Sequence, residues 1–212
     1  MERRQARAGR VNARRAAKTA AFWAATVLAA PAILSYWLKA AIVGRDRALA
    51  GSTQLLALAP GIPGQYLRRA FLCRVLAHCD PSATIEFGTV FSQAGARIDE
   101  QAYVGPRCHL GLVHLERDVL VAAGVHIPSG PDTHGIDDLS TPIRLQPGQP
   151  RMVRIGAGTW IGSGAIVMAD VGRDSVVGAG SIVTRALPDR VIAAGSPARV
   201  RRHRDQAGRH SA

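Results

Sequence analysis

The chain of 212 residues is long enough for one well-filled domain with an appendage, and its 47% hydrophobic and 20% charged residues are ordinary for a globular protein. Its 27 basic and 15 acidic residues give a net charge of +12, concentrated at the two ends, where we expect negatively charged partners. The three cysteines, Cys73, Cys79 and Cys108, have no zinc-ligand spacing, so they indicate neither a disulfide framework nor a structural metal site and favour a reducing compartment.

Residues 1–19 form a basic arm in which Glu2 is the one acidic residue. No aromatic residue lies among the basic ones to stack on bases, so nucleic acid is not the expected partner. The positive-inside rule instead predicts that this arm stays in the cytoplasm, beside an anionic membrane.

An apolar segment follows directly, and its first 18 residues, from Ala21 to Leu38, carry no charge. Trp23, Tyr36 and Trp37 lie near its ends, as aromatic residues do at membrane surfaces. A buried amphipathic helix is the alternative, but the apolar residues occur all round the helix instead of along one stripe. A cleaved signal peptide is a further alternative, although the stretch is long for one. The pattern predicts a membrane segment.

The topology of residues 20–80 has two interpretations, because basic residues also follow the apolar segment. Pro31 removes a helical hydrogen bond in mid-segment, which favours a re-entrant helix, break and helix with both ends cytoplasmic. The alternative is a hairpin whose return pass is residues 48–67. Residues 66–78 are then predicted to form a short amphipathic helix that lies on the lipid headgroups. Either arrangement places the rest of the chain at the cytoplasmic face of a bacterial inner membrane.

A repeat with a period of six begins at Ile85. One aliphatic residue in each six can point into a narrow core, while small residues beside it permit tight corners, so short strands stack into a parallel β-solenoid. We expect this domain at residues 81–200, with an interruption at 131–152 and a basic tail at 201–212. The aligned hexapeptides begin at Ile85, Ile98, Val104, Leu115, Val121, Ile155, Ile161 and Val177.

Two motifs make the resemblance specific. Residues 160–184, WIGSGAIVMADVGRDSVVGAGSIVT, and 191–202, VIAAGSPARVRR, are similar to the last coils and the closing element of the hexapeptide-repeat acyltransferases. The nearest branch is the one with virginiamycin-type and colanic-acid-type acetyltransferases. The resemblance implies an all-β fold, a left-handed parallel β-helix, here with an α-helical membrane-associated region before it. It also implies a homotrimer that transfers acetyl from acetyl-CoA to a sugar hydroxyl, with no metal. The apolar segment adds membrane lipids as expected partners.

The interruption carries the candidate base. The run HIPSGPDTHGIDD resembles the stretch around that family's catalytic histidine, which places His134 in the role. A neutral imidazole can take the proton of the acceptor hydroxyl as the hydroxyl oxygen attacks the thioester. Asp132, Asp137 or Asp138 would orient the ring or bind sugar hydroxyls, and the sequence leaves open which one. The remaining candidates for the base are His109, His114 and His126.

The resemblance implies that the acetyl donor lies in a groove between adjacent solenoids, with its pantetheine arm along the late coils. Its phosphates are expected towards the basic carboxyl end. A solvated tail is the alternative for the arginines. The expected contacts are Trp160, Ser163, Gly178, Ala179, Ser181, Arg199 and Arg201.

Two other function classes remain open. His109 and His114 are five residues apart, a separation at which γ-carbonic anhydrases, which share the solenoid, bind zinc, although zinc needs a third histidine. A trimeric scaffold without activity is the second alternative, against which His134 argues. The acceptor itself is not readable, and membrane attachment favours a lipid-linked glycan precursor.

Overall fold

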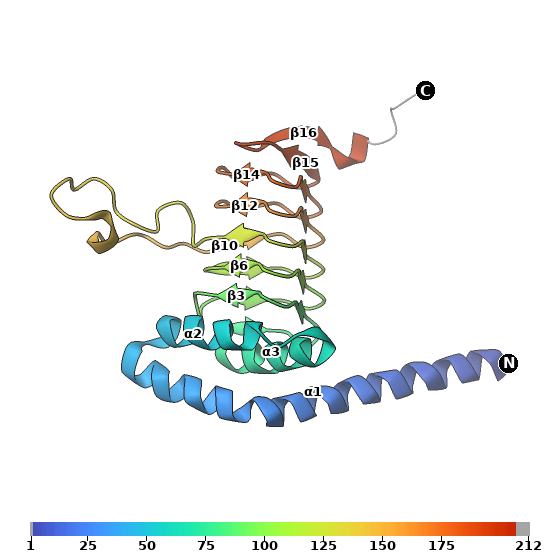
Figure 1. Cartoon of the computed structure of the whole chain (residues 1–212). Coiled ribbons are helices and arrows are strands. Elements are labelled where there is room, and N and C mark those ends of the chain that lie inside the picture. Colours follow the sequence, from blue (N-terminus) through green and yellow to red (C-terminus); the bar gives the residue numbers. More distant parts are fainter. Residues whose placement is uncertain (1, 207–212) are drawn as a thin grey trace.

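The computed structural model describes the backbone of residues 2–206 and the side chains of residues 16–205. A parallel β-solenoid stands on a base of three helices (Figure 1). The helices are α1 (Glu2–Val43), α2 (Arg45–Ala57) and α3 (Gly61–Val75). The predicted fold class, a β-solenoid preceded by a helical region, is confirmed.

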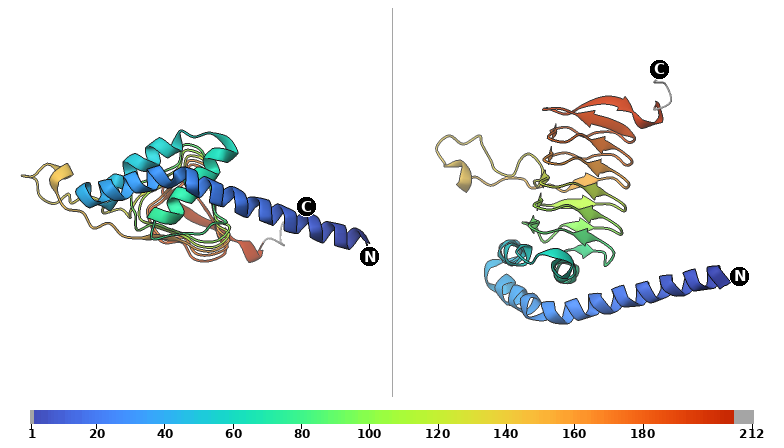
Figure 2. Two further views of the ribbon diagram at one scale, coloured as in Figure 1. Left: turned by 90° about the horizontal axis from the view of Figure 1, so that it is seen from below. Right: turned by 45° about the vertical axis from the view of Figure 1, so that its right-hand side comes forward.

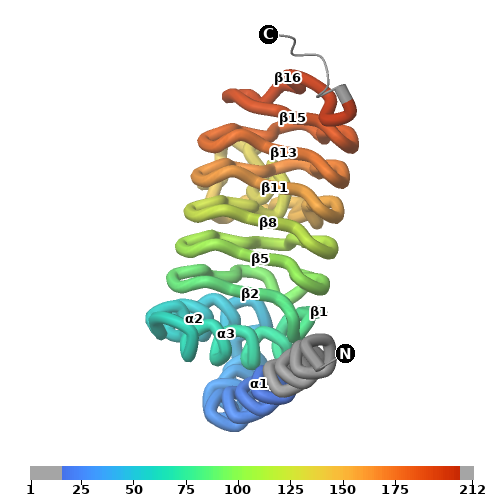
Figure 3. The backbone as a smooth tube through the Cα atoms, turned by 90° about the vertical axis from the view of Figure 1, so that its right-hand side faces the viewer, coloured from blue at the N-terminus to red at the C-terminus, as the bar shows by residue number. Residues whose placement is uncertain are grey.

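Three sheets form the sides of the solenoid, whose coils are stacked one on another (Figure 3). The later coils join the four-stranded sheet only through isolated bridges at Val171 and Leu187. The four-stranded sheet holds β1 (His78–Cys79), β4 (Arg97–Ile98), β7 (Val113–Leu115) and β10 (Val153–Ile155). The seven-stranded sheet holds β2 (Thr84–Ile85), β5 (Tyr103–Val104), β8 (Leu120–Val121), β11 (Trp160–Ile161), β13 (Val176–Val177), β15 (Val191–Ala194) and β16 (Arg199–His203). The five-stranded sheet holds β3 (Val90–Phe91), β6 (His109–Leu110), β9 (His126–Ile127), β12 (Ile166–Val167) and β14 (Ile182–Val183).

The core of the solenoid is the column of aliphatic side chains that the repeat predicted. All eight residues that open the aligned hexapeptides are fully buried, with 0% exposed surface. Buried hydroxyls complete the corners: that of Thr159 donates to the Gly172 carbonyl at 2.7 Å and accepts from the backbone N–H of Ser175 at 3.1 Å. Apolar burial and satisfied corner amides therefore stabilise each coil on its neighbour.

The two ends of the solenoid differ from the expected boundaries. The first strand, β1, begins at His78, a few residues earlier than predicted. Arg201 and Arg202, expected to start a solvated tail, lie in β16, which pairs antiparallel with β15 and closes the top of the solenoid. The short 3₁₀ helix Arg204–Gln206 follows it.

The helical base corrects the expected break at Pro31. Helix α1 continues through this proline, and the chain turns instead at Gly44, whose φ of 84° suits a residue without a side chain. Tyr36 on α1 is fully buried and packs edge-on against Phe71 of α3, with ring centroids 5.9 Å apart. Packing on α3 supports the helix where the proline removes a hydrogen bond.

The hairpin alternative is also wrong, because α2 packs against the solenoid. Leu49 is fully buried, and the hydroxyl of Thr53 donates to the Phe91 carbonyl at 3.1 Å. Within the described residues, one helical segment, Ala16–Val43, is long and apolar enough to cross a membrane, and 11% of its apolar window is buried.

Arg68 of α3 fastens the base to the first coil. Its side chain is 2% exposed, and it donates to the carbonyls of Ile85, Leu56 and Ala59. Burial lowers its pKa from the usual value for arginine. The guanidinium thus satisfies carbonyls where α2 ends and where the solenoid begins.

Candidate functional site

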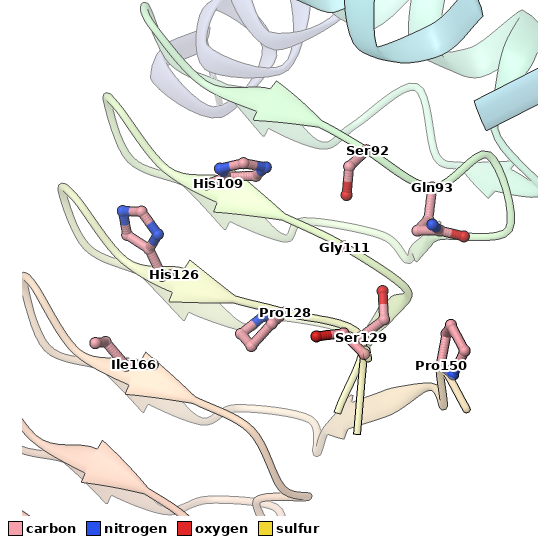
Figure 4. Close-up of a pocket in the computed structure, with 10 residues that line it drawn as sticks. Ser92, Gln93, His109, Gly111, His126, Pro128, Ser129, Pro150 and Ile166 are labelled. Atoms are coloured by element: carbon pink, nitrogen blue, oxygen red, sulfur yellow. The ribbon is translucent and has the colours of Figure 1, made fainter. Parts of the chain in front are cut away.

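A cleft of about 410 Å³ lies on the face of the five-stranded sheet, beside the loop that interrupts the repeat (Figure 4). Its floor is formed by side chains of β6, β9 and β12, and its rim by the segments that leave β3, β6 and β9. The lining residues are Ser92, Gln93, His109, Gly111, His126, Pro128, Ser129, Thr133, Pro150 and Ile166.

Two histidines lie one above the other in the cleft. His109 and His126 are register partners in neighbouring strands, and their ring centroids are 5.7 Å apart at an angle of 50°. Burial, and next the adjacent His126, lower the pKa of His109 below that of a free imidazole. The floor of the cleft therefore presents an imidazole that favours its neutral form, with a nitrogen able to accept a hydrogen bond.

The other candidate histidine of the solenoid lies elsewhere. His114 is in β7 of the four-stranded sheet, where its Nε2 is 2.9 Å from the Asp99 carboxylate. His109 and His114 are thus on different sides of the solenoid, and the described residues contain no group of three His, Cys, Asp or Glu side chains that could hold a metal ion. Within the described residues, His109 and His114 are therefore not close enough to bind one zinc ion, as the carbonic anhydrase interpretation requires.

The interrupting loop has a narrow neck that is built from backbone contacts. Arg151 donates its N–H to the Ser129 carbonyl at 2.8 Å, and Gln149 donates to the Asp132 carbonyl at 2.7 Å. A Cβ at Gly148 would lie 2.2 Å from the carbonyl oxygen of Thr133 and 2.6 Å from the His134 nitrogen. The two arms of the loop therefore touch at the candidate base, and only glycine permits the contact.

His134 lies on the arm that borders the cleft. It is exposed, and the preceding residue, Thr133, lines the cleft. The hydroxyl of Ser129, at the foot of this arm, accepts the N–H of Leu112 at 2.9 Å. This hydrogen bond fixes the foot of the arm that carries His134 to the coil of the solenoid that precedes β9.

The aspartates of the loop separate into different environments. The Asp138 carboxylate accepts hydrogen bonds from the hydroxyl and the N–H of Ser140, and such bonds hold its pKa at about 2. The amide of Gln146 binds the Asp138 carbonyl and N–H, which orders the loop tip. Among the described contacts, none joins His134 to Asp132, Asp137 or Asp138, so the choice of an orienting carboxylate stays a prediction.

The residues expected at the donor lie on the upper coils. Trp160 projects from β11 with 50% of its surface exposed, and Ser163 and Ala179 are exposed at the corner between the seven-stranded and five-stranded sheets. Gly178, at the same corner, is partly exposed. Ser181 does not fit the expectation, because its side chain is 1% exposed and its hydroxyl accepts the Gly195 N–H.

The two expected phosphate contacts lie at the top of the solenoid. Arg199 and Arg201 are exposed in β16 at the edge of the seven-stranded sheet. The guanidinium of Arg199 donates to the carbonyl of Ala198 at 3.2 Å.

Several cleft residues were not singled out from the sequence, namely Ser92, Gln93, Ser129, Thr133 and Pro150. The repeat held a signal for the floor: His109 and His126 each precede a core aliphatic residue and are one coil apart. Register in the repeat places such residues in one column on the surface. The rim comes from corners and loop arms, which the repeat does not place.

Comparisons with known proteins show which proteins this chain resembles. The family described as "Hexapeptide repeat of succinyl-transferase" matches residues 152–185. Galactoside O-acetyltransferase of Lactococcus lactis subsp. lactis is 38% identical over 42% of the chain, and the match spans 45% of that protein's length. Galactoside O-acetyltransferase of Escherichia coli (strain K12) is 28% identical over 71% of the chain and 84% of its own length.

Solved structures show the same fold. A maltose O-acetyltransferase from Clostridium difficile 630 superposes with a TM-score of 0.64 and 21% identity, covering 74% of this chain and 86% of that one. A galactoside acetyltransferase in complex with coenzyme A superposes with a TM-score of 0.57 and 22% identity, over 78% and 84% of the two chains.

Proposed function

We propose that the chain, which resembles the hexapeptide-repeat acyltransferases, is an O-acetyltransferase that moves acetyl from acetyl-CoA to a sugar hydroxyl. The observation that carries the proposal is the loop that holds His134 beside a cleft floored by His109 and His126. The names of the relatives, galactoside and maltose O-acetyltransferases, support a sugar as the acceptor.

In the proposed reaction, His134 acts as general base. Its imidazole takes the proton of the acceptor hydroxyl while the hydroxyl oxygen attacks the thioester carbonyl, and the C–S bond then breaks to release the thiol of coenzyme A. The imidazolium returns its proton to the leaving sulfur, so atoms and charge balance. His109 and His126 bind acceptor hydroxyls on the floor of the cleft, as donors or acceptors according to tautomer.

The acetyl donor extends along the upper coils. Trp160, Ser163, Gly178 and Ala179 offer an apolar ring and small residues that permit close approach of the pantetheine arm. Arg199 and Arg201, at the top, meet its phosphates. Asp132 and Asp137 are the remaining candidates for the carboxylate that orients His134, since Asp138 is engaged by Ser140.

A second copy of the chain completes the site in this proposal. The tip of the loop exposes apolar side chains, of which Leu139 is 99% and Ile136 is 68% exposed. The loop projects away from its own solenoid (Figures 1 and 2). A homotrimer, with each loop packed on the adjacent solenoid, buries these side chains.

The helical base supports a membrane-linked acceptor, at the cytoplasmic face of a bacterial inner membrane. The cleft begins at Ser92, directly after β3, the strand on which α2 packs. Neighbouring coils are about 4.8 Å apart, so His109 and His126 lie roughly 5 and 10 Å above that level. A lipid-linked glycan long enough to extend past the helices of the base (Figure 1) reaches this site while its lipid stays in the bilayer.

The experiment is to incubate membranes that contain the protein with labelled acetyl-CoA and to fractionate the products. We expect label in lipid-linked glycans, formed about 10²–10⁴-fold more slowly by membranes with His134→Ala. Label confined to soluble small molecules would remove the lipid-linked acceptor and keep the acetyl transfer. No difference between the wild type and membranes without the protein would remove both.

A further inference from the structure

A second cleft lies at the opposite end of the molecule from β16, between α1, α3 and the first coil. It encloses about 920 Å³ and combines aromatic and basic side chains: Phe22, Trp23 and Tyr66 with Lys18 and Arg69. The solenoid wall contributes Asp80, whose carboxylate already accepts the hydroxyl and N–H of Ser82 at 2.6 and 2.7 Å. The acetyl transfer chemistry uses none of these residues.

Arg69 is held in this cleft without a carboxylate partner. Its guanidinium donates to the Ala83 carbonyl at 3.1 Å and lies over the rings of Tyr66 and Phe22, 4.5 and 5.6 Å from their centroids. Its Nε is buried and has no hydrogen-bond partner. In the part of the chain with described side chains, neither Arg69 nor Lys18 belongs to an ion pair. A fixed cation of this kind suits an anion from outside the protein.

The face of α1 next to the cleft is apolar and exposed. Trp23, Val27, Leu34 and Trp37 fall within about 80° of one another on the helix. Their exposed fractions are 57%, 73%, 63% and 45%. Between Thr19 and Val43 the one charged residue is Lys39, and its ammonium turns inward to the hydroxyl of Ser52 at 3.1 Å. A charge-free helical face of this length marks an interaction surface.

Arginines lie beside both tryptophans of this face. The Arg74 guanidinium is 5.8 Å from the Trp23 ring, and that of Arg45 is 5.6 Å from the Trp37 ring. Tryptophan with adjacent arginine is the combination expected at the depth of lipid headgroups, where the ring meets the acyl boundary and the cation meets phosphate. The surface therefore has apolar and cationic parts that match an anionic bilayer.

We propose that the helical base lies along an anionic bilayer, with the cleft between α1 and α3 holding a lipid phosphate between Lys18 and Arg69. Helix α1 crosses the foot of the solenoid instead of extending its axis (Figures 1 and 2), so its outward face is parallel to the membrane surface. The acyl chains of the bound lipid lie against the exposed apolar face of α1. The solenoid then stands away from the membrane.

The test measures binding of the full chain to vesicles of phosphatidylcholine alone and to vesicles with added phosphatidylglycerol. Lys18→Gln and Arg69→Gln each remove a cleft cation, and Arg47→Gln removes an exposed cation of α2 outside the cleft. Lys18 is exposed at the cleft mouth, so its variant keeps the test valid where Arg69→Gln alters folding. Circular dichroism verifies that each variant is folded.

We expect tighter binding to the anionic vesicles, and about fivefold weaker binding for Lys18→Gln and for Arg69→Gln, with Arg47→Gln close to wild type. Equal binding of the wild type to both vesicle types would overturn the proposal. So would an equal loss for Arg47→Gln, or displacement of the protein from vesicles by millimolar inorganic phosphate at matched ionic strength. These measurements need no acceptor and no acetyl-CoA, so their failure leaves the proposed acetyl transfer untouched.

Discussion

His109 and His126 occupy equivalent positions in successive coils, and their rings lie 5.7 Å apart over the floor of the cleft. Burial, and next the adjacent His126, lower the pKa of His109. The stability that His109 contributes therefore depends on pH, and the sign of the effect follows from the lowered pKa.

A histidine whose pKa is lower in the folded state binds protons more weakly than in the unfolded chain. Its neutral form gives full stability above the unfolded pKa of about 6.5, and stability is lost as the pH falls below that value, towards the folded pKa. We expect the thermal midpoint to fall between pH 7 and pH 5, and to fall less in His109→Asn. A steeper fall in His109→Asn than in the wild type would contradict the assignment.

Substitution of Gly148 tests whether the neck of the loop positions the base. Gly148→Ala places a Cβ 2.2 Å from the Thr133 carbonyl oxygen, so the arm that carries His134 must move. A misplacement near 1 Å can cost about 10²-fold in rate, and we expect such a loss in kcat with little change in the thermal midpoint, because the loop is outside the core.

Gly51→Ala is the matched control, since a Cβ there meets nothing within 4 Å and the residue is helical. We expect this variant to keep its activity and to gain about 0.5–1 kcal/mol in stability. Full activity of Gly148→Ala would show that the neck does not position the base.

Arg68 tests how the helical base is joined to the solenoid. Arg68→Met keeps the volume but removes the hydrogen bonds of the guanidinium to the carbonyls of Ile85, Leu56 and Ala59. The Leu56 carbonyl still accepts the N–H of Ala59. Each bond to a charged group is worth about 1.5–3 kcal/mol, part of which offsets the burial of the charge. We expect hydrogen exchange to speed up in α2 and α3 and to remain slow in β11 and β13.

Arg47→Met, on the exposed surface of α2, serves as the control for the loss of a cation. Protection of α2 and α3 equal in Arg68→Met and the wild type would mean that the apolar contacts alone hold the base.

Ile161 tests the solenoid core. Its side chain is fully buried within one coil, and Ile161→Ala should lower the free energy of unfolding by about 2–5 kcal/mol, as measured by denaturant titration. The exposed neighbour Trp160→Ala should have a smaller effect on stability. An equal effect for both would contradict the inward and outward assignment of the strand.

The solenoid could be predicted because its constraint is local and repeated. Each coil has room for one large aliphatic residue at each inward position, so Ile155 and Ile161 are six residues apart and both fully buried. The same holds for Ile98 and Val104. The resemblance to the hexapeptide-repeat acyltransferases and the interrupting loop followed from the same stretch. The placement within the virginiamycin-type and colanic-acid-type branch stays a prediction.

The helical base could not be predicted in the same way. Helix α1 is apolar on all sides, so the sequence does not reveal which arc packs on α3 and which stays exposed. Pro31 carries a local preference for a break, but the contact of Tyr36 with Phe71 keeps the helix continuous, and the turn falls at Gly44. Both the arc of α1 that packs on α3 and the position of the turn therefore depend on tertiary packing.

The site was predictable in part. His134 follows from the loop motif, whereas the pairing of His109 with His126 depends on the number of residues in each coil, which sets the register between strands. Ser181 is buried, and its hydroxyl accepts the N–H of Gly195 in the next coil. No local sequence pattern predicts that contact.

The most direct measurement is the rate of acetyl transfer from labelled acetyl-CoA to the lipid-linked glycan fraction by His134→Ala, compared with the wild type and with His114→Ala. His114 lies on another side of the solenoid, bound to Asp99, so its variant controls for the loss of an imidazole. We expect His134→Ala to be about 10²–10⁴-fold slower, folded and membrane-bound, with His114→Ala still active. A rate near wild type for His134→Ala would contradict the assignment of the base.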